Sequence, residues 1–319
     1  MKAVLCNNYG GPEVLQISEI PRPAINENEV LIQLVCSNVN IGDIRIRKAD
    51  PWAVRLFFGF TKPKRSILGG TFSGRIVQTG KKVTKWKPGD EVFGTTELRF
   101  GTYAEFVTMN ENDFLSVKPG NVGFESASSS VFGTATAYDF IRKAKIRKGD
   151  KVLVYGASGS VGSAAVQLLN YLGAEVTAVC GGGNLDAVKS LGADEVLNYK
   201  TVNWKTLEGK FDVVYETVNK LDYKLCKSLL KKEGTLILGA ADFGTMLKGI
   251  SHQLFSRHKV LSGMIKTKKE DIDFIAMLLE KNVLTPLIDR SYTMDEIQEA
   301  HRYVESGRKR GNVVLEIGV

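Results

Sequence analysis

An apolar segment that runs directly into a glycine-rich turn, residues 151–162, constrains the fold of this chain more than any other. It reads Lys-Val-Leu-Val-Tyr and then Gly-Ala-Ser-Gly-Ser-Val-Gly. A strand, a tight turn and a closely packed helix need small residues, and we assign those places to Ala157, Gly159 and Gly162. The helix expected over 161–172 would offer its unpaired N-terminal amides to an anion. The segment predicts a phosphate-binding turn, with a purely structural turn as the alternative.

Strand and helix patterns alternate after this turn, which favours the nucleotide-binding interpretation. Such alternation is typical of an α/β fold with a doubly wound parallel sheet, in which ligands bind beyond the carboxyl ends of the strands. We expect strands at 175–179, 195–198, 211–217 and 235–239, and helices over 185–191 and 223–231. The predicted dinucleotide-binding residues are therefore Ala157, Ser158, Gly159, Ser160, Val161, Gly162, Gly181, Asn184, Thr217, Val218, Gly239 and Ala240.

The length and composition are those of a globular protein with two domains. The chain has 319 residues, of which 43% are hydrophobic and 24% charged. No stretch reaches the roughly 18 consecutive apolar residues of a membrane span, and the first residues lead into a strand pattern instead of a signal peptide. Four cysteines are scattered singly, which suits a reducing compartment. We expect a cytoplasmic protein without a membrane partner.

A net charge of +8 is the one unusual feature of the composition. Basic residues are dense in 45–65 and in 142–151. Such density is compatible with binding to nucleic acid or to an anionic surface. No nucleic-acid motif accompanies either run, so we favour a solvated basic face that also attracts a polyanionic cofactor.

The segments on both sides of the alternating region indicate a second domain. Residues 1–119 contain short strand patterns separated by glycine and proline, as in an all-β barrel-like domain. The tail after residue 264 holds two helical patterns and a strand over 312–317, and it is too short to be a domain of its own. We therefore predict one domain over 1–119, completed by 265–319, and a dinucleotide-binding domain over 120–264.

Eight stretches along the chain form one recognisable set: residues 1–4, 9–15, 38–43, 86–92, 101–105, 136–138, 156–162 and 190–199. Together they resemble the medium-chain dehydrogenase/reductase superfamily, and within it the zinc-free quinone oxidoreductase-like group. The resemblance implies a GroES-like barrel with an inserted Rossmann domain, an active cleft between them, a nicotinamide cofactor and commonly a homodimer.

The resemblance also addresses the metal. Where zinc-dependent relatives carry ligands, this chain has Asn40, Gly70 with Thr71, and Phe132, and only Asp43 survives from that constellation. The histidines, at 252, 258 and 301, lie far from these positions in sequence. We expect no zinc. Without a Lewis acid, hydride addition to a quinone or a conjugated carbonyl remains accessible, with protein hydrogen bonds to the developing oxyanion.

The candidate catalytic residues follow from the same resemblance. Asn40 would orient the nicotinamide amide or the substrate oxygen, with Thr136 nearby; ordinary packing is the alternative for both. Arg45 stands where many quinone reductases have a tyrosine and could stabilise an oxyanion, but it cannot act as an acid. The proton donor is unassigned, with Tyr103 and Tyr138 as residual candidates that also fit structural roles. The aromatic segment 50–63 could be a lid over the substrate, a dimer surface or a core surface.

The loop expected after the second strand, residues 178–184, bears on the choice of cofactor. It lacks the carboxylate that usually binds the ribose 2′-hydroxyl of NAD. Tyr199 matches a tyrosine that NADPH-dependent relatives use, and Asn312 stands where relatives often carry lysine. We therefore expect NADP(H), with the charge for the 2′-phosphate from Lys189, Lys200 or Arg310. The alternative to a reductase is a low-activity NADP(H)-binding protein with a regulatory or nucleic-acid-interacting role.

Overall fold

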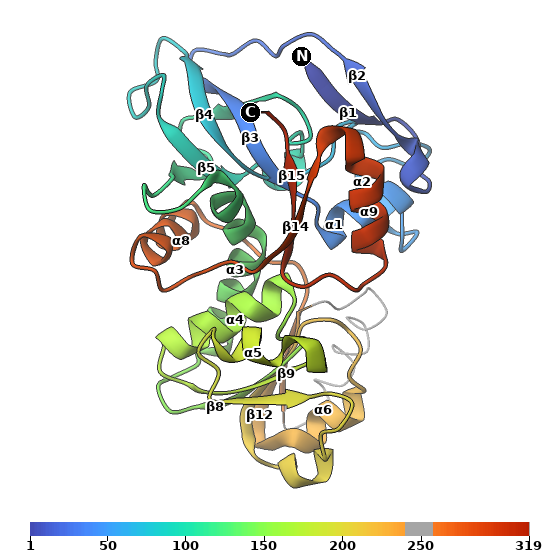
Figure 1. The fold of residues 1–319 in the computed structure, drawn as a ribbon, viewed down its shortest axis with the longest axis vertical. Coiled ribbons are helices and arrows are strands. Elements are labelled where there is room, and N and C mark those ends of the chain that lie inside the picture. Colours follow the sequence, from blue (N-terminus) through green and yellow to red (C-terminus); the bar gives the residue numbers. More distant parts are fainter. Residues whose placement is uncertain (240–257, 319) are drawn as a thin grey trace. The chain divides into compact units, whose positions relative to one another are not determined.

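The computed structural model describes residues 1–239 and 258–318 of the chain. The chain divides into two compact units. Unit 1 contains Met1–Phe132, Lys268–Asn282 and Leu287–Val319, and unit 2 contains Gly133–Thr267 and Val283–Pro286. The long helix α3 (Phe124–Ala144) continues across the boundary between them (Figure 1). The predicted domain limits at 119/120 and 264/265 stay a prediction.

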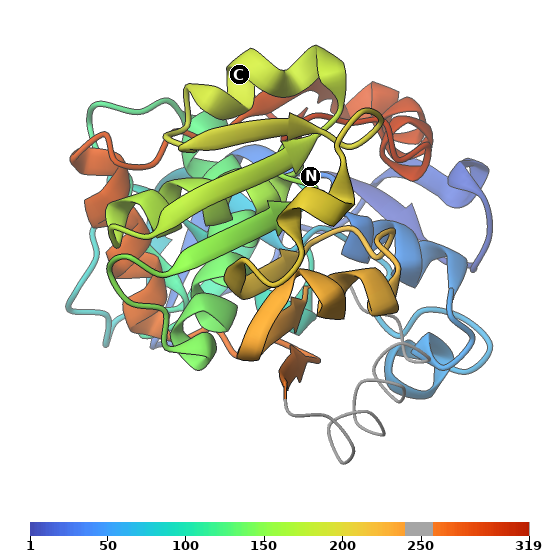
Figure 2. The same cartoon turned by 90° about the horizontal axis from the view of Figure 1, so that it is seen from below.

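Unit 2 is built on a six-stranded sheet in which every pairing is parallel. Its strands lie side by side with a regular twist (Figure 2). In spatial order they are β10 (Glu195–Asn198), β9 (Glu175–Cys180), β8 (Lys151–Tyr155), β11 (Phe211–Glu216), β12 (Leu230–Leu238) and β13 (Lys259–Ser262). Numbered along the chain this order is 3-2-1-4-5-6, which confirms the predicted doubly wound sheet.

The helices of unit 2 follow the strands in the predicted alternation. Along α4 (Ser160–Tyr171), apolar residues recur on the face that packs on the sheet, and Ala165, Val166 and Leu169 are fully buried there. Leu172, the last residue of the helix predicted over 161–172, is 37% exposed because it follows the last turn of the helix. The described helices of this unit are α4 (Ser160–Tyr171), α5 (Leu185–Lys189) and α6 (Tyr223–Leu229), with short 3₁₀ turns η3 (Gly182–Asn184) and η4 (Trp204–Leu207).

Unit 1 contains a mainly antiparallel sheet that the end of the chain completes. The central strand is β3 (Glu29–Asn38), which pairs with β4, β6 and β15. The path through the sheet is β14 (Ile288–Thr293), β15 (Asn312–Glu316), β3, β4 (Thr71–Thr79), β5 (Glu91–Thr95) and β7 (Leu115–Val117), with β6 (Phe106–Asn110) beside β3. A separate antiparallel pair joins β1 (Lys2–Cys6) to β2 (Leu15–Glu19).

Helices interrupt the all-β pattern that was predicted for residues 1–119, which was wrong in this respect. Two lie in that stretch, α1 (Ile41–Lys48) and α2 (Val54–Phe58), and two more come from the C-terminal part, α8 (Lys269–Glu280) and α9 (Ile297–Glu305). Three 3₁₀ turns complete the unit: η1 (Pro12–Val14), η2 (Glu97–Arg99) and η5 (Met294–Glu296).

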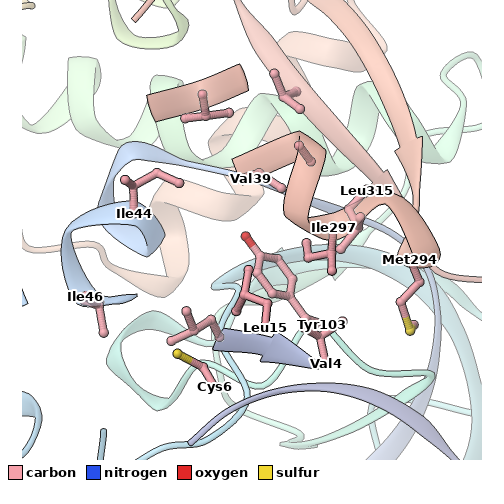
Figure 3. Close-up of a cluster of buried hydrophobic side chains, with 14 of the residues drawn as sticks. Val4, Cys6, Leu15, Val39, Ile44, Ile46, Tyr103, Met294, Ile297 and Leu315 are labelled. Carbon is pink, nitrogen blue, oxygen red and sulfur yellow. The ribbon is translucent and has the colours of Figure 1, made fainter. Parts of the chain in front are cut away.

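One hydrophobic cluster joins the two ends of the chain within unit 1. It combines Val4 and Leu15 with Ile44 of α1, Ile297 of α9 and Leu315 of β15. Tyr103 lies in the middle of this cluster, and its hydroxyl points towards the segment that holds Val39 (Figure 3). A buried polar group needs a hydrogen-bond partner, so the surroundings of this hydroxyl decide what the tyrosine does. None of the described helices is long and apolar enough to cross a membrane.

Candidate functional site

The turn between β8 and α4 has the geometry of a phosphate-binding loop. Gly156 has φ +81°, where a Cβ would come within 2.6 Å of the Thr217 hydroxyl. A Cβ on Gly162 would lie 2.2 Å from the Gly156 carbonyl oxygen, so only glycine lets α4 begin this close to the turn. The structure corrects the predicted assignment at one place, because Gly156 and not Ala157 has the positive φ of the tight bend. Gly159 has room for a Cβ, whose nearest neighbour would be 3.4 Å away, so its predicted place beside the pyrophosphate stays a prediction.

The first backbone N–H groups of α4 have no acceptor within the helix and point out of its N-terminal end. Its N-cap is Gly159, which has no side chain to accept hydrogen bonds from the first amides of the helix. Ser160 and Val161 open the helix, and Gly133 of α3 packs against it so closely that a Cβ there would meet the Ser160 carbonyl oxygen at 2.4 Å. Backbone amides at a helix N-terminus bind phosphate through both hydrogen bonds and the helix dipole. These residues therefore fit the pyrophosphate of a dinucleotide.

Neighbouring loops meet this turn at the carboxyl edge of the sheet, as predicted. The Asn184 side chain donates to the Ser158 hydroxyl at 3.4 Å, and Thr217 donates to the carbonyls of Tyr155 and Gly156 at 2.8 and 3.3 Å. Val218 follows Thr217 and is partly exposed. Further along the edge, the Gly239 N–H bonds to the Glu216 carbonyl at 2.8 Å. Ala240 and Ala241 lie outside the described residues.

Glu216 was not predicted, although it shapes the loop after β11. Its carboxylate is almost fully buried and accepts the backbone N–H groups of Val218, Asn219 and Lys220 at 3.2, 2.6 and 3.1 Å. Burial raises its pKa, and these hydrogen bonds oppose that rise. An acidic residue at the end of a buried strand was the available signal. Glu216 fixes the backbone that carries Thr217 and Val218.

The loop after β9 presents no carboxylate at the edge of the sheet. Cys180 ends the strand, and Gly181, Gly182 and Gly183 follow. The Tyr199 N–H bonds to the Cys180 carbonyl at 3.0 Å, which brings the half-exposed tyrosine ring beside Gly181. A Cβ on Gly181 would lie 3.5 Å from that ring, so a side chain can be accommodated there. This edge lacks the negative charge that would repel a 2′-phosphate.

Asn40 and Asp43 lie together in unit 1 at the start of α1. Asn40 is the N-cap, and its N–H donates to the Asp43 carboxylate at 2.8 Å. The Gly69 N–H donates to the same carboxylate at 3.2 Å, and the Tyr103 hydroxyl also bonds to it. Burial raises the Asp43 pKa to about 6, and the hydrogen bonds to the carboxylate oppose that rise. The buried aspartate thus fixes the backbone of the predicted catalytic Asn40.

Tyr103 has a structural environment and not that of a proton donor. It is fully buried, its hydroxyl lies 3.3 Å from the Asn38 carbonyl oxygen, and its ring packs edge-on against His301 at 5.8 Å. Burial and the neighbouring Asp43 raise its pKa well above the usual value. The phenol therefore stays protonated and supports Asp43.

Arg47 and His301 form a second buried polar group that sequence reasoning missed. Both side chains are fully buried, and Arg47 donates to Glu305 of α9 at 2.5 Å. Among the described residues, no partner bonds to the Nε and Nη1 atoms of Arg47 or to either ring nitrogen of His301. Burial, and then Arg47, lower the pKa of His301 to about 3, so this histidine is neutral at physiological pH.

The remaining predicted residues are distributed over both units. Arg45 lies half-buried on α1, whereas Thr136 and Tyr138 belong to the part of α3 in unit 2. Asn312 is buried in unit 1, and both its backbone and its side-chain amide donate to the Leu287 carbonyl, at 2.8 and 3.0 Å. That bond explains the position of Asn312 without a ligand. Its role in cofactor binding, like the catalytic roles of Arg45 and Thr136, stays a prediction.

Potential metal ligands do not cluster in the described part of the chain. Within residues 1–239 and 258–318, no three side chains of His, Cys, Asp or Glu converge in a way that could hold a metal ion. His258 instead pairs with the Lys231 carbonyl at 3.2 Å, and His252 lies outside the described residues.

Comparisons with known proteins agree with this geometry. The family described as alcohol dehydrogenase GroES-like domain matches residues 26–119, and the family described as zinc-binding dehydrogenase matches residues 191–315. The 2-methylene-furan-3-one reductase of Solanum lycopersicum is 30% identical over 99% of this chain and 79% of its own length. A chloroplast envelope quinone oxidoreductase homolog of Arabidopsis thaliana is 29% identical over 99% of this chain and 98% of its own length.

A solved structure shows the same fold over the whole chain. The quinone oxidoreductase from Coxiella burnetii superposes with a TM-score of 0.88 at 24% identity, covering 100% of this chain and 99% of that one. The sheet order of unit 2, the phosphate-binding turn and the matched families lead to one conclusion. The chain belongs to the medium-chain dehydrogenase/reductase superfamily, in its quinone oxidoreductase-like group, and is an oxidoreductase that binds a nicotinamide cofactor.

Proposed function

We propose that this protein is a zinc-independent, NADPH-dependent reductase that transfers hydride to a quinone or to an α,β-unsaturated carbonyl compound. The observation that carries the proposal is the edge of the sheet in unit 2, where a glycine turn suited to phosphate lies beside a loop without a carboxylate. The names of the tomato and Arabidopsis relatives support the two substrate classes, since one names a conjugated ketone and the other a quinone.

Bound NADPH would supply the hydride, so the protein's own task is to position the reactants and stabilise charge. The amides of Ser160, Val161 and Gly162 would hold the pyrophosphate. Asn40 would orient the nicotinamide amide or the substrate oxygen, and its backbone is fixed for that purpose by Asp43. The positions at which zinc-dependent relatives carry ligands hold Asn40, Gly70, Thr71 and Phe132, and these side chains do not form a zinc site.

The preference for NADPH over NADH rests on the loop after β9. An acidic residue there would bind the 2′-hydroxyl of NAD and repel a 2′-phosphate. Gly181 and Gly183 offer backbone and space instead, and the exposed Tyr199 and Lys200 are adjacent in sequence. The ring of Tyr199 would pack along the adenosine side of the cofactor, with Lys200 as a candidate cation for the phosphate.

Two measurements test the proposal in order. Titration of the purified protein with NADPH and with NADH should give tighter binding of NADPH. Steady-state loss of NADPH absorbance should then show turnover with benzoquinones, naphthoquinones, 2-alkenals or cyclic enones, unchanged after treatment with a chelator. Equal affinity for NADPH and NADH would contradict the proposed preference for NADPH. Failure to turn over any of these substrates would contradict the proposed reaction. The homodimer and cytoplasmic residence stay proposals, which size-exclusion chromatography with light scattering and cell fractionation would test.

A further inference from the structure

Four large apolar side chains stand exposed on one segment of unit 1. They are Trp52, Leu56, Phe57 and Phe60, with 59, 59, 74 and 63% of their surface exposed. We call this set the aromatic patch. Trp52 and Phe60 contact each other edge-to-face, with ring centroids 5.9 Å apart, so these two exposed rings form one surface, and Leu56 and Phe57 lie between them in the sequence. Contiguous exposed apolar surface of this kind marks an interaction site.

The patch is held on a firmly attached scaffold. Val54 and Phe58, on the inner side of α2, pack against the hydrophobic cluster of unit 1, and the Phe58 ring lies 5.7 Å from that of Phe100. The Tyr9 hydroxyl donates to the Gly59 carbonyl at 2.6 Å. The inner side chains of α2 already pack on the core of unit 1. Packing within the unit therefore does not explain why the outward-facing residues are apolar.

Positive charge borders the patch on its C-terminal side. Residues 51–65 contain two arginines and two lysines but no acidic residue. Arg55 donates to the Phe60 carbonyl at 3.1 Å and stacks on Tyr9, so it is tied to the scaffold. Lys62, Lys64 and Arg65 are exposed, and within the described part of the chain they form no ion pair. Three cations therefore face solvent directly beside the aromatic patch.

We propose that the aromatic patch and Lys62, Lys64 and Arg65 form a docking surface for an anionic lipid bilayer. Tryptophan and phenylalanine are stable at the boundary between headgroups and acyl chains, and lysine and arginine add attraction to anionic headgroups. Four shallowly inserted apolar side chains with a cationic border give reversible attachment to the membrane surface. This docking does not depend on the proposed reaction.

The same charges argue against a second copy of the chain as the occupant. A two-fold interface would place the patch against itself and bring the cationic borders of both copies together. Like charges in contact oppose association. Nucleic acid would satisfy the cations, but it would leave the aliphatic Leu56 and the far side of Phe57 in water. A bilayer accommodates both the apolar and the cationic parts.

Co-sedimentation of the full-length protein with lipid vesicles tests the proposal. We expect binding to phosphatidylcholine vesicles that contain about one third phosphatidylglycerol, and at least about tenfold weaker binding to pure phosphatidylcholine. Two variants should each weaken binding by at least about tenfold: L56S/F57S, which keeps all charges, and K62E/K64E/R65E, which keeps the apolar residues. The matched control is K145E/R147E/K148E, which makes the same charge change in the other basic stretch and should bind like the natural chain.

Fluorescence of Trp52 gives a second readout. The chain has three tryptophans. Vesicle binding should shift the emission to shorter wavelength in the natural protein but not in W52F, and unchanged thermal unfolding of each variant confirms that it is folded. No binding to anionic vesicles would overturn the proposal, as would binding that both patch variants retain. One further result would overturn the proposal. The natural protein would shift single-stranded nucleic acid in a gel, both patch variants would lose that shift, and no protein would bind vesicles.

Discussion

The backbone N–H of Gly69 donates a hydrogen bond to the buried Asp43 carboxylate at 3.2 Å, across 26 positions of sequence. Gly69 has φ +83°, and a Cβ at this residue would come within 2.4 Å of the Tyr103 ring. The absence of a side chain therefore lets one backbone reach both the aspartate and the tyrosine. This contact connects the segment just before β4 with the start of α1, where the predicted catalytic Asn40 lies.

Replacing Asp43 with asparagine should change how stability depends on pH. The Asp43 pKa is raised from 3.8 to about 6 in the folded protein, so the folded state holds the proton more tightly than the unfolded chain does. This contribution to stability is complete below the unfolded pKa and is lost as the pH rises through 6. It falls by about 2 kcal/mol between roughly pH 4 and pH 7. Urea unfolding of both proteins across this range should show the loss in the natural chain and not in D43N. Parallel curves would contradict the assignment.

Titration of His301 should make the protein less stable as the pH falls, which is the opposite of the effect of Asp43. Its pKa is lowered from 6.5 to about 3 by burial and by Arg47, so the unfolded chain takes up a proton first when the pH falls. Stability is then lost below the unfolded pKa, by about 2 kcal/mol between roughly pH 7 and pH 5. His301→Leu removes no hydrogen bond to a described residue, so it should be tolerated at pH 7 and should abolish this acid-side loss. A variant as acid-sensitive as the natural protein would show that another group is responsible.

The two cations that share Glu305 should differ in importance. Arg47 is fully buried where it meets this carboxylate at 2.5 Å, whereas Lys48, at 2.7 Å, has a side chain that is 39% exposed. Glu305→Gln should lower the free energy of unfolding by about 2 kcal/mol, because it leaves the buried guanidinium without its counter-charge. Lys48→Gln should cost less than about 1 kcal/mol, since solvent screens that pair. Equal losses in the two variants, measured by urea unfolding, would contradict the role of burial.

Replacing two glycines of the phosphate-binding turn, one at a time, should distinguish an effect on packing from an effect on cofactor binding. Gly162→Ala places a Cβ 2.2 Å from a backbone oxygen, so we expect lower thermal stability and at least about tenfold weaker NADPH binding. Gly159→Ala meets nothing closer than 3.4 Å, so the melting temperature should stay unchanged while NADPH binding weakens, because the added methyl group obstructs the pyrophosphate. Unchanged NADPH affinity in both variants, measured by fluorescence titration, would place the cofactor elsewhere.

A single charge in the loop after β9 should alter cofactor preference. Gly181→Asp introduces the carboxylate that this loop lacks, at a position where a Cβ fits beside Tyr199. We expect the dissociation constant for NADPH to rise by at least about tenfold, while binding of NADH is kept or improved. Gly181→Asn is the matched control, with the same shape and no charge, and should alter NADPH binding far less. Equal effects of the two variants would point to sterics and not to charge.

Much of the fold could be predicted where local sequence pattern and tertiary role coincide. The limits of the strand β10 were predicted to the residue, at 195–198. The order of strand and helix from β8 to β12 predicted the parallel sheet. The position of the phosphate-binding edge could be predicted because the carboxyl ends of parallel strands lie together at one edge of the sheet.

Other elements depend on contacts that the local sequence does not reveal. The helix α3 was not predicted, since its first two turns are rich in serine and it contains a glycine and two threonines, which are weak helix formers. Gly133 within it is required instead by the close approach of α4.

The buried polar groups of unit 1 were the least predictable part of the candidate site. Asp43 was selected by family resemblance, but its partners Gly69 and Tyr103 come from distant segments. Arg47 and His301 are separated by most of the chain and meet only in the folded core. Residue type alone suggests a solvated arginine and an unremarkable histidine, because burial of a charged group is decided by tertiary packing.

The strand β15 pairs with β3, so the central sheet of unit 1 receives one of its inner strands from residues that leave the ribosome long after β3 itself. During synthesis, all six strands of the unit 2 sheet emerge before β15 is available to pair with β3. Newly made chains should therefore acquire protease resistance first in the middle of the sequence, and a chaperone would meet an N-terminal segment whose apolar strand edge is still unpaired.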